Sequence, residues 1–191
     1  MMRKTPIYLD NNATTPLRAA AITAMQDAMG PPANPSSVHG FGRNARLIVE
    51  MARSAVAMLA GCRAADVVFT SGGTEANNLV MAQYDHVITS AIEHDSVRYA
   101  HQDCQQIGVD ENGVVDLDRL AKVIAGIDDA AKPRTLVSIM AANNETGVIQ
   151  PMDEIAAMAE SANIALHSDM VQIFGKRHIN FATSKISYAS L

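Results

Sequence analysis

The sequence of 191 residues has no tryptophan, only four tyrosines and four phenylalanines, and only two cysteines. Cys62 and Cys104 are too few for a disulfide framework or a zinc knuckle, so we interpret them as packing residues. No apolar run approaches the roughly 18 residues of a membrane-spanning helix, and the first residues lack the apolar core of a signal peptide. We therefore expect a cytoplasmic protein without membrane contact.

Positive charge is also scarce, because 15 Lys and Arg against 20 Asp and Glu give a formal net charge of −5. A chain without a basic run has no electrostatic footprint for nucleic acid or for an anionic membrane surface, and we expect neither partner. The hydrophobic fraction of 48% is that of an ordinary globular protein with a core of its own.

Short β-branched runs alternate with longer stretches of helical periodicity. This alternation predicts an α/β fold with a mainly parallel sheet and flanking helices. The predicted strands are 7–9, 67–70, 87–90, 136–140, 164–167 and 186–191, and helices are predicted to begin near Pro16, Gly42, Thr74, Ser96, Asp116 and Met152.

The helix predicted from Gly42 has the clearest apolar stripe of the chain, and it ends at Gly61. We interpret this stripe as a core-facing surface, formed by Leu47, Ile48, Met51, Ala55, Val56 and Leu59. The preceding segment 30–37 is rich in proline and turn-forming residues, so we expect a loop there that separates the first helix from the main alternation.

A glycine turn joins the predicted strand 67–70 to the next helix and contains Gly73 and Thr74. A helix start exposes unpaired N–H groups and a partial positive charge, so a phosphate fits at this position. A tight turn with Thr74 as N-cap and no ligand is an equally good interpretation. The glycine spacing matches neither the dinucleotide fingerprint nor a Walker loop, so a nucleotide is not indicated.

Polar residues follow three other predicted strands. His94 could transfer protons, stack on a planar ring or be structural, and Asn144 lies in a segment that could hold a substrate or form a turn. Asp169 could meet a positive group or form a cap, and with His167 it lacks the third ligand of a metal site, so we expect no metal. Four loops at the carboxyl edge of the sheet would together suit a phosphorylated pyridine such as pyridoxal phosphate.

Six motifs in this order resemble the cysteine desulfurases of the nitrogen-fixation and iron–sulfur-assembly type, in class V of the aminotransferase-like, fold-type I pyridoxal-phosphate enzymes. They are YLDNNATTP at 8–16, NPSSVHG at 34–40, TSGGTEAN at 70–77, EH at 93–94, NNETG at 143–147 and HSDMVQ at 167–172. The resemblance implies the large cofactor-binding domain of that fold over residues 31–191, incomplete at its C-terminal end. Residues 1–30 would be an N-terminal segment that packs with the small domain of the family.

The resemblance also implies pyridoxal 5′-phosphate as the cofactor. Gly73 and Thr74 would hold its phosphate. His94 would stack on the pyridine ring as the catalytic residue and shuttle protons.

Three further residues are implied to bind the ring. Asn144 and Gln172 would bond its phenolic oxygen, with Asn144 also near the substrate carboxylate. Asp169 would pair with the ring nitrogen and keep it protonated, so that the ring accepts electrons from the substrate.

Members of the family convert L-cysteine to L-alanine and leave the sulfur as a persulfide on a mobile cysteine. Their Schiff-base lysine lies just beyond the strand that aligns with 186–191, so we expect no covalent anchor in this chain and no activity of the chain alone. Lys185 would lie roughly 20 Å from the cofactor, at about 3.3 Å per strand residue. Lys176 aligns with a connector and is interpreted as a surface charge.

The resemblance implies a homodimer, or pairing with a C-terminal polypeptide, and a sulfur-acceptor protein as a further partner. Two other functions remain open. A chain of this fold could be a binding or dimerisation module without catalysis, since a fold does not determine a function. Within enzymes, a selenocysteine lyase or another class V aminotransferase would have the same motifs.

Overall fold

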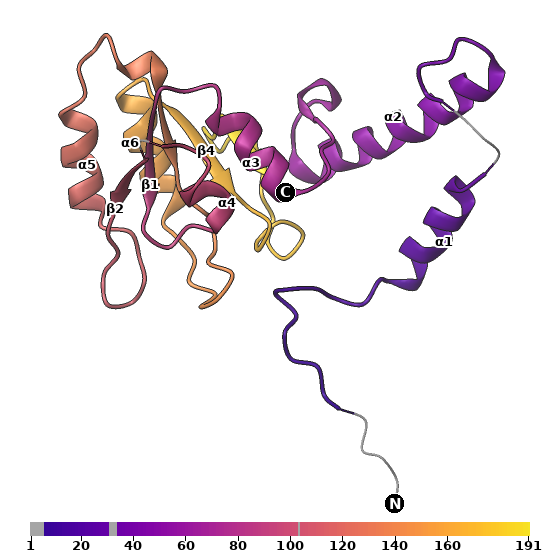
Figure 1. Ribbon diagram of the computed structural model, residues 1–191, viewed down its shortest axis with the longest axis horizontal. Helices are drawn as coiled ribbons and strands as arrows, with labels where there is room; N and C mark the ends of the chain where they lie inside the picture. The colour runs from indigo at the N-terminus through magenta and orange to yellow at the C-terminus, as the bar shows by residue number, and fades with distance from the viewer. Residues whose placement is uncertain (1–5, 31–33, 103) are drawn as a thin grey trace, which may run out of the picture.

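The computed structural model describes residues 6–30, 34–102 and 104–191 (Figure 1). Its strands are β1 (His86–Ser90), β2 (Cys104–Ile107), β3 (Thr135–Ser138), β4 (Ala165–Asp169) and β5 (Tyr188–Ser190). Its helices are α1 (Ala19–Ala28), α2 (Gly40–Ala60), α3 (Gly73–Met81), α4 (Asp95–Arg98), α5 (Leu117–Ala125) and α6 (Met152–Ser161), with short 3-10 turns η1 (Ala64–Asp66) and η2 (Lys132–Arg134).

The strands form one sheet in the order β2-β1-β3-β4-β5, and every pair is parallel. The central strands β1, β3 and β4 are buried along nearly their whole length. Buried parallel strands need helices on both faces. The predicted α/β class is confirmed.

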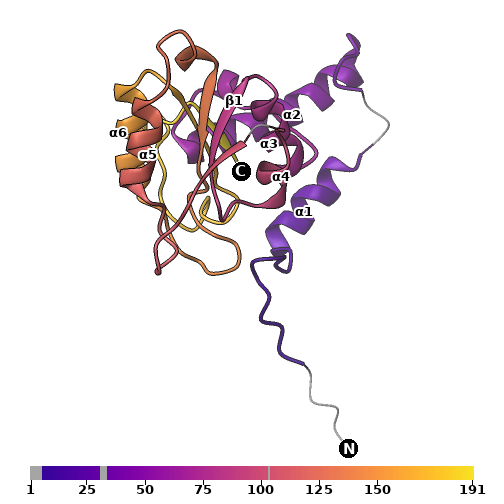
Figure 2. The same cartoon turned by 60° about the vertical axis from the view of Figure 1, so that its left-hand side comes forward.

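Helices cover the two faces of the sheet (Figures 1 and 2). On one face α5 and α6 pack on the larger core cluster, which includes Ile88, Val137 and Leu166. On the other face α3 and α4 contribute Met81 and Val97 to a smaller cluster. The parallel arrangement brings the carboxyl ends of β1, β3 and β4 to one edge, which is where ligand sites of such sheets form.

Two predicted strands are not strands. Residues 7–9 and 67–70 carry no ladder in the described structure. Val67 is extended, but its carbonyl accepts a hydrogen bond from the Arg53 side chain, and the Arg53 guanidinium lies 4.9 Å from the centre of the Phe69 ring. Side-chain contacts with α2 therefore hold this segment where strand pairing was expected.

The region after β1 was also predicted wrongly. The helix expected from Ser96 is the single turn α4, and the edge strand β2, which begins at Cys104, was not predicted. Two glutamines in the middle of β2 are exposed, so this strand lacks the apolar pattern that marks the buried ones.

The apolar stripe of α2 does not face the core. Met51 is 64% exposed, and Leu47 and Leu59 are similarly exposed. The residues of α2 that are buried, Gly42, Ala57 and Ala60, are small ones. Within the described residues nothing covers the larger apolar side chains, and α1 has no buried residue at all.

Figure 1 shows α1 and α2 extending away from the sheet. The middle of the predicted loop 30–37, residues 31–33, lies outside the described residues, as does the predicted domain boundary at 31. The division into 1–30 and 31–191 stays a prediction. None of the helices described here is both long enough and apolar enough to cross a membrane.

Candidate functional site

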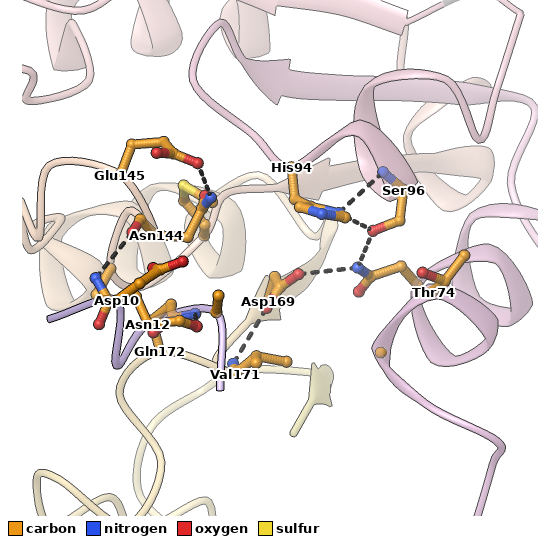
Figure 3. Close-up of a pocket in the computed structure, with 15 residues that line it drawn as sticks. Asp10, Asn12, Thr74, His94, Ser96, Asn144, Glu145, Asp169, Val171 and Gln172 are labelled. Atoms are coloured by element: carbon orange, nitrogen blue, oxygen red, sulfur yellow. Dashed lines mark hydrogen bonds between the residues drawn. The ribbon is translucent and has the colours of Figure 1, made fainter. Parts of the chain in front are cut away.

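A cavity of about 460 Å³ lies at the carboxyl edge of the sheet (Figure 3). All six residues to which we assigned a cofactor role line it: Gly73, Thr74, His94, Asn144, Asp169 and Gln172. They reach it from three strand ends and the start of α3. The expectation of four strand ends is corrected, because residues 67–70 before α3 are not a strand.

The first turn of α3 forms one wall of the cavity. Gly72, not Thr74, is the N-cap, and no side chain caps this helix end. Its first amides therefore point outward without a side-chain acceptor, and the helix dipole makes this end favourable for an anion. A Cβ on Gly73 would lie 3.3 Å from Val171 Cγ2, so the close approach of α3 to the segment after β4 favours glycine.

Asp169 also lines the cavity and is 9% exposed. Its Oδ2 accepts a hydrogen bond of 2.9 Å from Asn77 Nδ2, and its Oδ1 accepts one of 3.1 Å from the Val171 amide. A carboxylate has about four acceptor positions, so each oxygen keeps room for a further donor. Asp169 is thus a nearly buried anion that is fixed in place and can still bind a cationic group.

Asn77 and Ser96 connect Asp169 to His94 by hydrogen bonds. Figure 3 labels Asp169, Ser96 and His94 and marks the bonds as dashed lines. Asn77 Nδ2 also donates to Ser96 Oγ at 2.8 Å, and Ser96 Oγ lies 2.8 Å from His94 Nδ1. The Ser96 amide donates to the same Nδ1 at 3.1 Å. Because Nδ1 accepts this amide bond, the proton of the neutral ring is on Nε2. The hydrogen bonds fix both the orientation and the tautomer of the imidazole.

The N-terminal segment closes another side of the cavity. Asn12 Nδ2 donates to the Asn144 carbonyl at 2.8 Å, and the Asn12 carbonyl accepts from Gln172 Nε2 at 3.1 Å. Asp10 lines the cavity beside them. The Asn144 side chain donates to Glu145 at 2.7 Å. The expected amides are therefore present, and a segment 132 residues away in the chain holds them together.

Nine of the 15 lining residues were assigned no role from the sequence, and four of these nine are Asp10, Asn12, Asn77 and Ser96. Each of these four lies inside or close to a motif that carries the resemblance. This position was the one signal in the sequence that could have identified them as site residues. The contacts of Asn12, Asn77 and Ser96 join separate parts of the chain, which spacing within one motif does not show.

His167 is a buried structural residue and does not line the cavity. Its Nδ1 lies 2.8 Å from Ser138 Oγ and its Nε2 lies 3.0 Å from Ser190 Oγ, so the ring bridges β3, β4 and β5. Burial lowers the pKa of His167 to about 4, which keeps the ring neutral. Across the described ranges, no three His, Cys, Asp or Glu side chains are grouped so that they could hold a metal ion.

The two lysines considered as anchors are not among the residues that line the cavity. Lys185 pairs with Glu160 at the end of α6, which precedes β4, so it lies toward the opposite edge of the sheet. Lys176 is exposed, as expected, and its Nζ lies 3.2 Å from Gln172 Oε1. Cys62 and Cys104 are both partly buried.

Known proteins are similar to this chain both in sequence and in fold. The sequence family Aminotransferase class-V matches residues 7–190. Cysteine desulfurase IscS of Dictyoglomus turgidum is 37% identical, and the match covers 93% of this chain and 48% of that protein. The selenocysteine lyase of Bos taurus is 33% identical, and the match covers 97% of this chain and 51% of that protein.

A solved NifS-like protein from Rickettsia africae matches the structure with a TM-score of 0.90 and 35% identity, over 96% of this chain and 53% of the other. The chain spans about half the length of the curated relatives it matches. Since the family match covers nearly every residue and the fold agrees, this chain belongs to the class-V aminotransferase family and is related to the cysteine desulfurases.

Proposed function

We propose that this chain forms the cofactor-binding part of a pyridoxal-phosphate-dependent cysteine desulfurase. One observation carries the proposal: a single cavity is lined both by an uncapped helix start and by a fixed, nearly buried carboxylate. Relatives named cysteine desulfurase support the reaction.

The chemistry of the lining fits pyridoxal phosphate. The first amides of α3 and the Thr74 hydroxyl can donate to the phosphate. The acceptor positions left on Asp169 can receive the N–H of a protonated pyridine nitrogen. When bound, the cofactor supplies an electron sink for the bonds around the substrate α-carbon.

The remaining assigned residues orient the ring and handle protons. His94 presents an imidazole whose tautomer Ser96 fixes, so its Nε2, which carries the proton, can donate to a ligand while the ring stacks on an aromatic surface. Asn144 and Gln172 offer amide groups for the phenolic oxygen, and Asn12 keeps the two close to each other. Because the cavity is bordered by separate segments, these positions depend on the packing of the sheet.

We further propose that the reaction converts L-cysteine to L-alanine with transfer of sulfur to an acceptor protein, and that these 191 residues alone do not catalyse it. Neither Lys176 nor Lys185 lines the cavity, although Lys176 donates a hydrogen bond to the side chain of Gln172, which does. A covalent anchor would have to come from outside these 191 residues. Selenocysteine is the alternative substrate, because a selenocysteine lyase is among the relatives.

The cofactor proposal is tested by equilibrium dialysis of the purified chain with pyridoxal phosphate. Asp169→Ala should weaken binding about tenfold or more, because a charge-assisted hydrogen bond is lost. The matched control Asp118→Ala removes an exposed carboxylate of α5 and should leave binding unchanged. Equal affinity of the Asp169 variant and the wild type would contradict the proposal.

The anchor proposal is tested by borohydride reduction followed by mass spectrometry. The chain alone should give no cofactor adduct on a lysine. Mixing it with a polypeptide that carries the C-terminal half of a related desulfurase should give the adduct on that polypeptide and release alanine from L-cysteine. A reduced adduct on a lysine of the 191-residue chain would show that it anchors the cofactor itself.

A second candidate is a dimerisation or binding module without catalysis. The exposed apolar side chains of α1 and α2 favour it, because a surface of this kind usually meets another protein. Binding of pyridoxal phosphate that depends on Asp169 would speak for the enzyme, and association without any cofactor binding would speak for the module.

A further inference from the structure

The loop between β1 and α4 contains a buried carboxyl group with no role in the function proposed above. Glu93 is only 4% exposed and directly precedes His94. Its Oε1 accepts a hydrogen bond of 2.5 Å from Ser90 Oγ and one of 2.9 Å from the Met140 amide. Met140 follows β3 and lines the cavity, so Glu93 joins two of the segments that border it.

The hydrogen bonds of Glu93 are unevenly shared between its oxygens. Both end on Oε1, while Oε2 is buried and has no hydrogen-bond partner among the described residues. An ionised carboxylate would place half of its charge on this unbonded oxygen, which costs more than burying a neutral hydroxyl. In a carboxylic acid one oxygen is a carbonyl acceptor and the other carries the proton. The observed bonds fit the acid with its proton on Oε2.

The charged surroundings favour the same form. No Lys or Arg forms an ion pair with Glu93 in the described structure, and Asp169, at the end of β4, is a charge of the same sign. Nearby His94 is bonded to Ser96, and His167 on β4 is bonded between two serines. Burial raises the pKa of Glu93 to about 8 and Asp169 adds to the rise, although the bonds from Ser90 and Met140 oppose it.

We propose that Glu93 is a positioning residue that remains a neutral carboxylic acid and fastens the His94 loop to the segment after β3. The side chain does not line the cavity, so it acts through the residues it holds. Because Glu93 is neutral, Asp169 is not repelled by a second buried negative charge. The inference rests on the proposed function for the meaning of His94, while the hydrogen bonds and the protonation are properties of the chain without cofactor.

The protonation is tested by infrared spectroscopy of the chain without cofactor near pH 6.5. The wild type should show the carbonyl stretch of a protonated carboxylic acid, and Glu93→Gln should lack it. Glu154→Gln, which removes an exposed carboxylate of α6, is the control and should keep the band. Absence of the band from the wild type, or its survival in Glu93→Gln, would overturn the proposal.

The fastening is tested by amide hydrogen exchange of segments 91–98 and 140–144, again without cofactor. Gln keeps a neutral carbonyl acceptor, so Glu93→Gln should retain the wild-type protection. Glu93→Asp and Glu93→Ala lose the reach or the acceptor and should exchange about tenfold faster or more in these segments. If Glu93→Ala does not fold, the comparison of Gln with Asp decides. Unchanged protection in the Asp variant would overturn the proposal.

The pH dependence of the affinity for pyridoxal phosphate is a readout that would not change if Glu93 were merely structural. The affinity of the wild type for pyridoxal phosphate should fall as the pH rises past 8, whereas the affinity of Glu93→Gln should fall less over the same range. Parallel pH profiles would overturn the link to the cavity. If neither protein binds pyridoxal phosphate, the proposed function fails, and the infrared and exchange results still decide the state of Glu93.

Discussion

At the scale of single residues, the cavity depends on side chains that hold other side chains. Asn77 uses both hydrogens of its amide, one on Asp169 and one on Ser96. The sequence predicted Asp169 and His94 because each follows a buried strand. It could not predict Asn77 as their connection, because that contact joins residues 92 positions apart.

Glu93 should make the free energy of unfolding depend on pH. Its pKa in the folded chain, about 8, lies above the ordinary value of 4.5, so the folded state binds more protons between these values. The wild type should therefore lose stability relative to Glu93→Gln as the pH rises from 4.5 to 8, by up to about 5 kcal/mol. Urea unfolding of both proteins across this range measures the difference, and a constant difference would refute it.

His167 should act in the opposite direction. Its pKa falls from 6.5 to about 4 in the folded chain, so the unfolded state binds more protons between these values and stability rises with pH. The rise should reach about 3 kcal/mol and should be missing in His167→Asn. Thermal unfolding of the wild type and of His167→Asn between pH 4 and 7 gives the slope of stability against pH for each protein. Equal slopes would mean that the buried ring does not titrate as described.

At the scale of elements, hydrophobic periodicity predicted the buried strands correctly. It failed for the edge strand β2 and for residues 67–70, where the presence or absence of a neighbouring strand decides the structure. Strands β1, β3 and β4 have continuous apolar sequences because both faces are covered. Edge strand β2 has two exposed glutamines, and residues 67–70 have β-branched side chains without a strand neighbour. Pairing with a neighbour is a property of the sheet, and the local sequence carries little information about it.

The end of α2 should depend on its glycine cap. Gly61 has a φ of +66°, and a Cβ there would lie 2.6 Å from Asn180 Oδ1. Gly61→Ala should lower the free energy of unfolding by about 1–3 kcal/mol, because the left-handed backbone and the contact both penalise a side chain.

Gly126, at the end of α5, is the matched control for Gly61. Its φ is −83°, and a Cβ would meet its nearest neighbour at 3.5 Å, an ordinary contact. Gly126→Ala should be neutral or stabilising by up to about 1 kcal/mol. Urea unfolding compares the two variants, and equal effects would show that backbone conformation does not explain the cost at Gly61.

At the scale of the whole molecule, the sheet and its flanking helices form a closed core, whereas α1 and α2 expose apolar faces. The periodicity of α2 identified which side chains form one face, but periodicity does not show what covers that face. The homodimer, or the pairing with a second polypeptide, that the resemblance implies would cover this exposed surface, and measurements in solution can test it.

We expect the purified chain to associate through α2. Met51→Lys places a charge within the exposed apolar face and should weaken association about tenfold or more without loss of folding, since the side chain is not part of the core. Ala157→Lys adds the same charge to an exposed position of α6 and should leave association unchanged. Light scattering across a dilution series compares them, and a wild type that is monomeric throughout would contradict the expectation.

The central claim is that separate segments at one edge of the sheet form a single cofactor site. The most direct test is a map of amide chemical shifts during titration with pyridoxal phosphate. Shifts should concentrate together at Gly73, Thr74, His94, Asn144 and Asp169, and they should diminish jointly in Asp169→Ala. Shifts confined to surface lysines, or changes at only one of these segments, would contradict a common binding site.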